Sequence, residues 1–179
     1  MISIGLDLSL THTGYVVIQV DGKVLTHGVI KSKPCGDRPI DEIRRIVKIS
    51  SEITDQLDKV LKVPPSIVCI EGLAFMAQGT SLTQLAGLSY ITRAFIDSCL
   101  WPFIIIAPTT LKKFITGSGK GDKDMVIMSV YKNYGFEASD NNEADAYSLA
   151  VCGLAVLGKP LKRSTKPQEE VISLLKKQL

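Results

Sequence analysis

Residues 2–8, ISIGLDL, alternate β-forming residues with small or polar ones, which predicts a first strand that carries Asp7 near its end. A polar turn leads into residues 14–20, GYVVIQV, which predict a second strand. Asp21-Gly22 is a strong signal for a two-residue hairpin, and residues 23–30, KVLTHGVI, supply the returning strand. The chain is therefore expected to open with three antiparallel strands.

The remainder of the chain alternates helical periodicity with short apolar runs. Helices are predicted for residues 39–61, 80–99, 123–134, 142–157 and 168–178, a short helix from an N-cap at Thr109 or Thr110 through Ile115, and buried strands for 66–70 and 103–106. This order predicts an α/β protein with a mixed sheet, three antiparallel strands followed by parallel ones, and flanking crossover helices. We expect one domain over 1–157 and a basic C-terminal linker and helix over 158–179.

The composition is that of an ordinary globular domain, with 179 residues, of which 45% are hydrophobic and 22% charged. Neither a basic leader before an apolar run nor an apolar stretch of about 20 residues is present, so we expect a cytoplasmic protein with no membrane contact. The four cysteines form no CxxC pair. Their spacing excludes a zinc ribbon or a disulfide scaffold and favours small, buried, reduced thiols.

The positive charge is concentrated near the C-terminus. The formal net charge of the chain is +3. Residues 159–179 hold six Lys or Arg against two Glu, which gives this segment +4 and leaves −1 for the remainder. Solvated surface is one interpretation of such lysines, and contact with a polyanion is the other.

Three carboxylates lie at the ends of predicted buried elements. Asp7 shares a strand face with Ser3 and Gly5, Glu71 follows the fourth predicted strand, and Asp145 lies near the start of an apolar helix. Burial makes a lone carboxylate costly at each position unless a cation or partner offsets the lost solvation. Each also has a simpler interpretation: Asp7 caps a turn, Glu71 is merely the first solvated residue, and Asp145 is favoured by the helix dipole.

Carboxylates that converge from two strands and a helix suit hard divalent cations with oxygen ligands, namely magnesium or manganese. Two such ions can activate water and stabilise the leaving oxygen of a phosphodiester. The carboxylates would then hold metal and would not attack the substrate themselves. The pattern thus points to metal-assisted phosphodiester hydrolysis.

Three segments resemble the motifs of the RuvC-type Holliday-junction resolvases of the RNase H-like superfamily. They are residues 5–15 (GLDLSLTHTGY), 70–76 (IEGLAFM) and 143–150 (EADAYSLA), and they look nearest to the shorter, phage-type members. The resemblance spans residues 1–157 and implies an RNase H-like fold, a homodimer and metal-dependent cleavage of Holliday junctions or other branched DNA in recombination and repair. It also implies two Mg²⁺ ions, for which Mn²⁺ substitutes, products with 5′-phosphate and 3′-hydroxyl ends, and a bacterial or phage-infected host cell.

The same resemblance makes Asp7, Glu71 and Asp145 metal ligands. Three residues before its last Asp the family has Asp or His, where this chain has Asn142, whose amide oxygen binds magnesium more weakly and without charge. We expect Asn142 to be the fourth ligand. Glu143 is the rival, although it lies about 200° round an ideal helix from Asp145, and Asp140 in the preceding loop is a further alternative.

The basic segment 111–123 is similar to the family segment that carries two important lysines, which by position are Lys112 and Lys123. The resemblance implies that their ammonium groups bind the DNA backbone and stabilise charge at the cleaved phosphate. Lys113 and Lys120 beside them are expected to bind DNA. The glycine loop between them lacks the GxxxxGK[ST] pattern of a nucleotide site.

Phe75 and Met76 end the second motif. The family uses an aromatic residue here to stack on unpaired bases, an interaction worth roughly 1–3 kcal/mol per base, while a core position is the alternative. Met76 is expected to wedge beside it. In the helix that follows, the small residues Ala86, Gly87 and Ser89 indicate a face that packs closely against a second subunit.

Other functions fit the sequence less well. A sugar-kinase or actin-like ATPase of the same fold would need a second phosphate hairpin and a glycine-rich adenosine motif, which the sequence lacks. The neutral Asn142 is the reason to consider a second alternative, a junction-binding protein without catalytic activity. A third alternative, an RNase H-like RNA nuclease, differs only in its substrate. Of the two histidines, His12 is expected at the surface and His27 in a structural role.

Overall fold

The first three strands form the predicted antiparallel meander. The computed structural model describes residues 1–73, 80–119 and 123–179. Strands β1 (Ile2–Asp7), β2 (His12–Gln19) and β3 (Val24–Lys31) pair in chain order. Gly22 closes the second hairpin with φ +87°, a conformation that glycine adopts without strain.

Two short parallel strands extend the sheet on the other side of β1. They are β4 (Ile67–Glu71) and β5 (Phe103–Ile106), which gives the order β3-β2-β1-β4-β5. Leu6 lies opposite Ile70 in the parallel register of β1 and β4. The last residues of these strands, Asp7 and Glu71, are therefore neighbours at one edge of the sheet.

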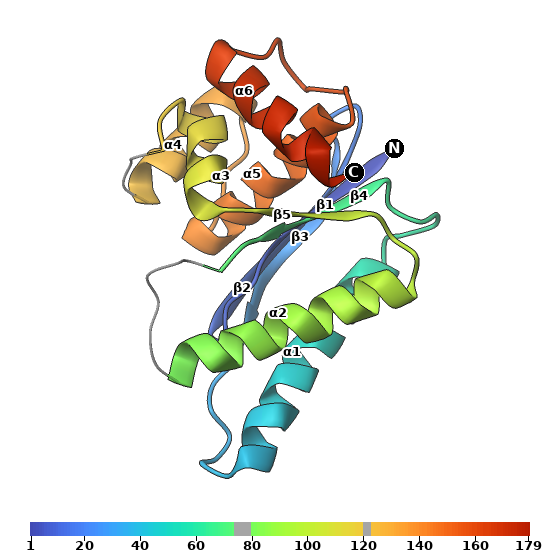
Figure 1. The fold of residues 1–179 in the computed structure, drawn as a ribbon, viewed down its shortest axis with the longest axis vertical. Coiled ribbons are helices and arrows are strands. Elements are labelled where there is room, and N and C mark those ends of the chain that lie inside the picture. Colours follow the sequence, from blue (N-terminus) through green and yellow to red (C-terminus); the bar gives the residue numbers. More distant parts are fainter. Residues whose placement is uncertain (74–79, 120–122) are drawn as a thin grey trace.

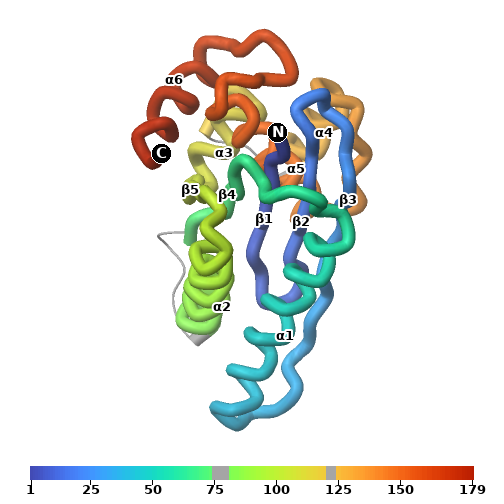
Figure 2. Tube along the Cα trace, turned by 90° about the vertical axis from the view of Figure 1, so that its right-hand side faces the viewer, coloured from blue at the N-terminus to red at the C-terminus, as the bar shows by residue number. Residues whose placement is uncertain are grey.

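Helices cover both faces of the sheet (Figures 1 and 2). One face carries α1 (Pro39–Asp58) and α2 (Thr80–Ser98). The other carries α3 (Pro108–Thr116), α4 (Lys123–Tyr134), α5 (Asn141–Val156) and α6 (Lys166–Leu175), which a 3₁₀ turn over Lys176–Gln178 follows. None of the helices in the described residues is long and apolar enough to span a membrane.

The alternation of side chains along the strands divides the core in two. Ile4 and Leu6 of β1 pack beneath α1 and α2. Cys69 and Ile104 of β4 and β5 pack on the other face, beneath α5. Since α5 is buried along nearly its whole length, it is the central helix of its layer.

Two local expectations were wrong. Helix α3 begins at Pro108 and has Ala107 as its N-cap, so neither Thr109 nor Thr110 caps it. Proline suits the first helical position because its fixed φ is already helical and its missing N–H needs no partner there. Cys35 is exposed, whereas Cys69 and Cys152 are buried as expected, and the thiols of all four cysteines are free.

Part of the small-residue face of α2 packs closely within the chain. A Cβ on Gly87 would lie 3.3 Å from Cδ1 of Ile46 in α1, and Ser89 is buried. Close packing is therefore confirmed at Gly87 and Ser89, and the contact of this helix with a second subunit stays a prediction.

The C-terminal segment is packed against the same layer. Val171 and Leu175 of α6 are buried with the residues of α3 and α5. The separation of residues 158–179 as a distinct unit stays a prediction.

Candidate active site

The side of β1 that faces α5 carries Ser3, Gly5 and Asp7, as their alternation predicts. A Cβ added to Gly153 would collide with the Ser3 hydroxyl, and a Cβ added to Gly5 would collide with the Ala146 carbonyl. Strand and helix thus lie in close contact and run in opposite directions. The next step along this face places Asp7 beside the first turns of α5.

Strand β2 fixes the same end of α5 from the other side. Gly14 pairs with Asp7 in the sheet register. A Cβ on Gly14 would collide with the Asn142 carbonyl, so Asn142 lies against the sheet at the level of Asp7. Asp145, three residues further along the helix, lies on the same helical face as Asn142.

Glu71 joins this group from β4. It has the same parity as Cys69, so it faces the α5 side of the sheet. Asp7 is buried, whereas Glu71, Asn142 and Asp145 are partly exposed. Asp7, Glu71 and Asp145 each take part in an interaction, so none of them is an unpartnered charge.

Asp140 caps the helix that carries Asn142 and Asp145. Its carboxylate accepts the backbone N–H of Glu143 at 3.0 Å and the side-chain amide of Asn142 at 3.3 Å. Asp145 is the fifth residue of α5, so it does not lie in the first turn that the dipole interpretation required. Asp140 is fixed as an N-cap beside the candidate ligands.

Glu143 points away from this group, as the 200° separation predicts. Its carboxylate lies 2.6 Å from Nδ1 of His27 in β3 and accepts the backbone N–H of Ser139. Burial acts to raise the pKa of Glu143, but the hydrogen bonds from Ser139 and His27 outweigh it and hold the pKa below its usual range. This pair, which joins residues 116 positions apart, has no local sequence signal.

The predicted lysines have different surroundings. Lys112 lies on α3 and takes part in an interaction, and Lys113 donates to the Glu170 carboxylate of α6 at 2.6 Å. That contact lowers the pKa of Glu170 and gives Lys113 a partner within the chain. Lys123 begins α4, but its side chain, together with Phe75, Met76 and Lys120, lies outside the described residues.

The donor set fits a hard divalent cation in its chemistry and in its backbone placement. It offers carboxylate and amide oxygens from two adjacent strand ends and one helix. Within the described ranges, no three His, Cys, Asp or Glu side chains are already grouped around a point that could hold a metal. The oxygen donors therefore lie at one edge of the sheet, but their side chains are not yet arranged as a complete metal site.

Comparison with known proteins identifies the family. A sequence model described as "Crossover junction endodeoxyribonuclease RuvC" matches residues 3–153. The chain belongs to the RuvC family. Relatives of that same description include a protein of Anaeromyxobacter sp. (strain Fw109-5), 29% identical, covering 87% of this chain and 73% of its own. Another relative, from Prochlorococcus marinus (strain MIT 9303), is 28% identical, and the match covers 84% of this chain and 96% of the relative.

Solved RuvC structures share the fold. Thermus thermophilus RuvC superposes with a TM-score of 0.71 at 22% identity, covering 89% of this chain and 98% of its own. A structure of T. thermophilus RuvC in complex with Holliday junction substrate gives 0.70 at 20% identity, covering 89% and 97%. The expected RNase H-like architecture of the RuvC family is confirmed.

Proposed function

We propose that this protein is a metal-dependent endonuclease that cleaves Holliday junctions or other branched DNA. The observation that carries the proposal is the placement of Asp7 and Glu71 at adjacent strand ends, facing the turn of α5 that holds Asn142 and Asp145. This arrangement occurs in a chain of the RuvC family. One RuvC of the same fold has been solved with a Holliday junction bound.

Asp7, Glu71, Asp145 and Asn142 would hold the divalent cations, two Mg²⁺ ions in our proposal. When bound, such ions supply Lewis-acid activation of water and stabilisation of the leaving oxygen. The chain's own task is to present oxygen donors at a fixed edge. The burial of Asp7 strengthens the attraction of its carboxylate for a cation, because less water screens it.

Lys112, on the helix that follows β5, and Lys123, at the start of α4, would supply positive charge near the cleaved phosphate. Ammonium groups bind backbone phosphates and stabilise the negative charge that develops during hydrolysis. Phe75, Met76 and Lys120 are proposed to contact the DNA beside them. Lys113 makes a weaker case, since Glu170 already neutralises it.

A four-way junction is two-fold symmetric and must be cut on two opposed strands. A homodimer matches this substrate because its own two-fold axis presents two equivalent sites. We therefore propose that the protein acts as a homodimer, with one carboxylate edge for each cleaved strand.

The neutral Asn142 supports a second candidate, a protein that binds junctions without cutting them. Two amide hydrogens and one oxygen replace a charged carboxylate at this position, which lowers the affinity for a cation. The two candidates differ in one observable, which is metal-dependent cleavage.

The deciding experiment compares a synthetic four-way DNA junction with a linear duplex of matched sequence, in Mg²⁺ or in EDTA. Wild type should make paired cuts on the junction in Mg²⁺ only. Asp7→Asn should reduce the rate at least 100-fold, while Asp55→Asn, which neutralises an exposed carboxylate on α1, should leave it unchanged. An RNA junction of the same sequence tests the choice of nucleic acid.

Asn142→Asp extends the comparison to the fourth position. The variant should lower the Mg²⁺ concentration needed for half-maximal rate, because it adds a negative charge to the donor set. Tight junction binding by wild type without cuts in Mg²⁺ or Mn²⁺ would instead establish the binding protein.

A further inference from the structure

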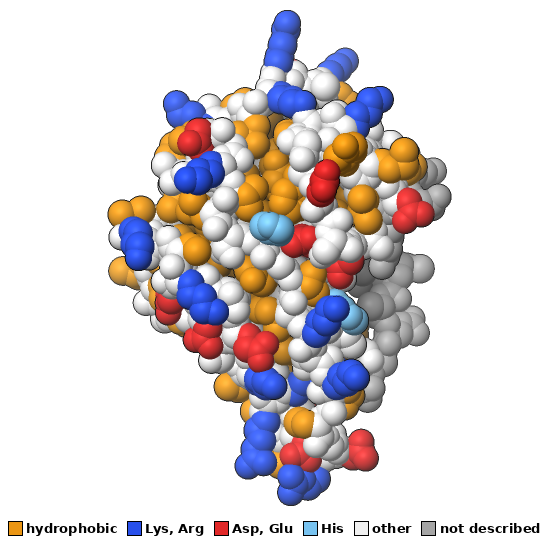
Figure 3. Space-filling view, turned by 180° about the vertical axis from the view of Figure 1, so that it is seen from behind, with side chains coloured by type: hydrophobic (Ala, Val, Ile, Leu, Met, Phe, Trp, Pro, Cys, Tyr) orange, Lys and Arg blue, Asp and Glu red, His pale blue; other side chains and the backbone are white. Residues whose placement is uncertain are grey.

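A second feature at the carboxylate end of the molecule is a hollow of about 280 Å³ lined almost wholly by cationic side chains. It lies between the end of β3 and the first turns of α1. Its lining consists of Lys31, Ser32, Lys33, Cys35, Arg44, Arg45 and Lys48, so five of seven residues are Lys or Arg and none is acidic. Figure 3 shows Lys and Arg side chains gathered at this lower end of the molecule.

The hollow is fixed to the chain segment that follows Asp7. The guanidinium of Arg45 donates to the Leu10 carbonyl and, at 3.1 Å, to the Ser32 hydroxyl. The Ser32 backbone N–H donates to the Thr11 carbonyl at 3.0 Å. Because Leu10 and Thr11 belong to the β1–β2 turn, the hollow cannot shift far relative to the carboxylate edge.

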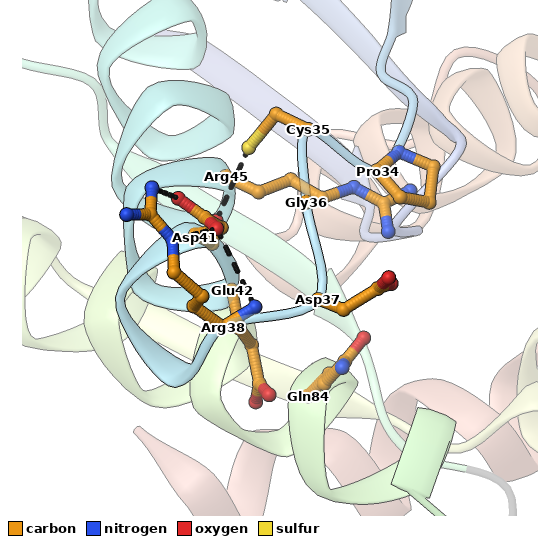
Figure 4. A pocket seen from close by; sticks show the side chains of 9 residues that line it. All are labelled: Pro34, Cys35, Gly36, Asp37, Arg38, Asp41, Glu42, Arg45 and Gln84. Carbon is orange, nitrogen blue, oxygen red and sulfur yellow. Dashed lines mark hydrogen bonds and ion pairs between the residues drawn. The ribbon is translucent and has the colours of Figure 1, made fainter.

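The loop between β3 and α1, residues 32–38, is also held at the end where it enters α1 (Figure 4). The Arg38 guanidinium makes two hydrogen bonds of 2.7 Å to the Asp41 carboxylate, and the Cys35 thiol donates to the Asp41 carbonyl. The neighbouring pocket drawn there contains Asp37, Asp41 and Glu42 beside its arginines. Its charges are mixed, so it bounds the cationic hollow and does not extend it.

Most of the positive charge in the hollow is available to a ligand. Arg44 and Lys48 have long contacts to carboxylates, 3.9 Å to Asp41 and 3.7 Å to Glu52. Lys31 and Lys33 are exposed and form no ion pair with any described residue. Like charges held this close to one another favour an anionic partner that neutralises several of them at once.

The position of the hollow indicates which kind of anion would bind there. Strand β3 runs in the same direction as β1, so Lys31 ends at the same edge of the sheet as Asp7. The two strands are separated by one intervening strand, or roughly 10 Å. Duplex DNA carries about one negative charge per 1.7 Å of its axis, so a DNA bound at the carboxylate edge has further phosphates within this reach.

We propose that this cationic hollow binds the sugar-phosphate backbone of one arm of the branched DNA substrate, beyond the phosphate that is cleaved. The inference rests on the proposed function and adds to it a second contact, on the side of the sheet away from β5. The lining contains no aromatic side chain for stacking on a base, which fits a backbone contact independent of sequence.

The test measures junction binding in EDTA, so that nothing is cleaved, over a series of salt concentrations. The double variant Lys31→Gln, Lys33→Gln is compared with Lys59→Gln, Lys62→Gln, which removes two exposed lysines at the opposite end of α1. Loss of two phosphate contacts should reduce the slope of log K against log salt by about 2. Between 50 and 200 mM salt, wild type should thus lose about tenfold more affinity than the Lys31, Lys33 variant.

The control variant should keep the wild-type slope, and all proteins should keep the wild-type melting temperature. Single-turnover cleavage at saturating protein should stay within about twofold for the Lys59, Lys62 control, since that pair touches neither the hollow nor the reacting phosphate. Wild-type binding and cleavage with an unchanged slope for the Lys31, Lys33 variant would overturn this inference alone. Failure of the wild type to bind the junction would overturn the proposed function together with it.

Discussion

At the scale of single residues, the first turns of α5 divide their side chains between two tasks. Asn142 and Asp145 lie on the side of the carboxylate edge, while Glu143 between them is directed to His27 and Ser139. A buried carboxylate that accepts two hydrogen bonds holds its helix turn firmly. We therefore expect Glu143 to act on the candidate site as a positioning residue, by fixing the turn that presents its neighbours.

The variant Glu143→Gln tests this positioning role. Glutamine retains the size of the side chain but loses the charge that strengthens the contacts to His27 and Ser139, so we expect a loss of about 1–3 kcal/mol in the free energy of unfolding. The Mg²⁺ concentration for half-maximal junction cleavage should rise several-fold, because the turn with Asn142 and Asp145 is held less firmly. Junction binding in EDTA should remain unchanged.

His27→Gln serves as the partner variant in this comparison. If the two changes act through the same contact, the double variant should lose less free energy of unfolding than the two single variants lose in sum. A wild-type Mg²⁺ dependence in both single variants would show that the contact serves stability only.

At the scale of elements, the site depends on how closely α5 approaches β1. The glycines at positions 5 and 14 leave room for the backbone of α5, and any side chain there would collide with a helix carbonyl. Backbone atoms cannot move aside as a flexible side chain can. The two glycines thus set how closely β1, which carries Asp7, approaches α5, which carries Asp145.

Gly5→Ala should consequently destabilise the protein by about 1–3 kcal/mol, as overpacking of a tight core does. Urea unfolding followed by circular dichroism measures the loss. Gly119→Ala is a suitable control, because its Cβ would lie 3.4 Å from the Thr109 carbonyl, an ordinary contact. Equal stability of the two variants would mean that α5 can shift away from the sheet, contrary to this account.

The start of α1 should show a dependence on pH. Hydrogen bonds from Arg38 hold the pKa of Asp41 below its usual value of 3.8. A carboxyl with a lowered folded pKa stabilises the protein above its unfolded pKa, and this contribution is lost as the pH falls through the folded value. Asp41→Asn should therefore lower the melting temperature at pH 7, and the gap to wild type should close below about pH 4.

Thermal melts at pH 7, 5, 4 and 3 measure this gap. Asp55→Asn, on the exposed side of the same helix, controls for the loss of one carboxylate. A gap for Asp41→Asn that stays constant down to pH 3 would assign its effect to the shape of the side chain and not to its charge.

The sequence predicted the elements and their order well, because alternation and helical periodicity are local. Asp7 and Glu71 were correctly expected on one edge, since parity along each strand and the order of strands determine their faces. The contact between His27 and Glu143 was out of reach, because no local pattern joins residues 116 positions apart. A row of small residues on α2 signals close packing but does not name the partner: Gly87 packs near Ile46 of α1, while a contact with a second subunit stays a prediction.

At the scale of the whole molecule, the proposed dimer needs an exposed apolar surface on each subunit. Several helices in the described part of the chain expose apolar side chains, among them Ile40, Ile43 and Val47 of α1, and two of these areas include a tyrosine. One is on α2, where Tyr90 and Ile91 are 66% and 36% exposed and the Arg93 guanidinium lies 4.1 Å from the Tyr90 ring centroid. The other is on α4, around Met128 and Tyr131. Tyrosine and arginine are enriched at the centres of interfaces, which favours α2.

We therefore expect Ile91→Lys to convert a dimer of twice 19.5 kDa into a monomer, and Met128→Lys on α4 to leave the dimer intact. Light scattering during gel filtration measures the mass. A lysine at the centre of an apolar interface would be desolvated without a partner, whereas the same change on a solvent-exposed helix costs little. The monomer should nick single strands of the junction but lose the paired cuts, since each subunit carries one carboxylate edge. The opposite result, a monomer for Met128→Lys and a dimer for Ile91→Lys, would contradict this choice. It would place the dimer interface on α4, which covers the other face of the sheet.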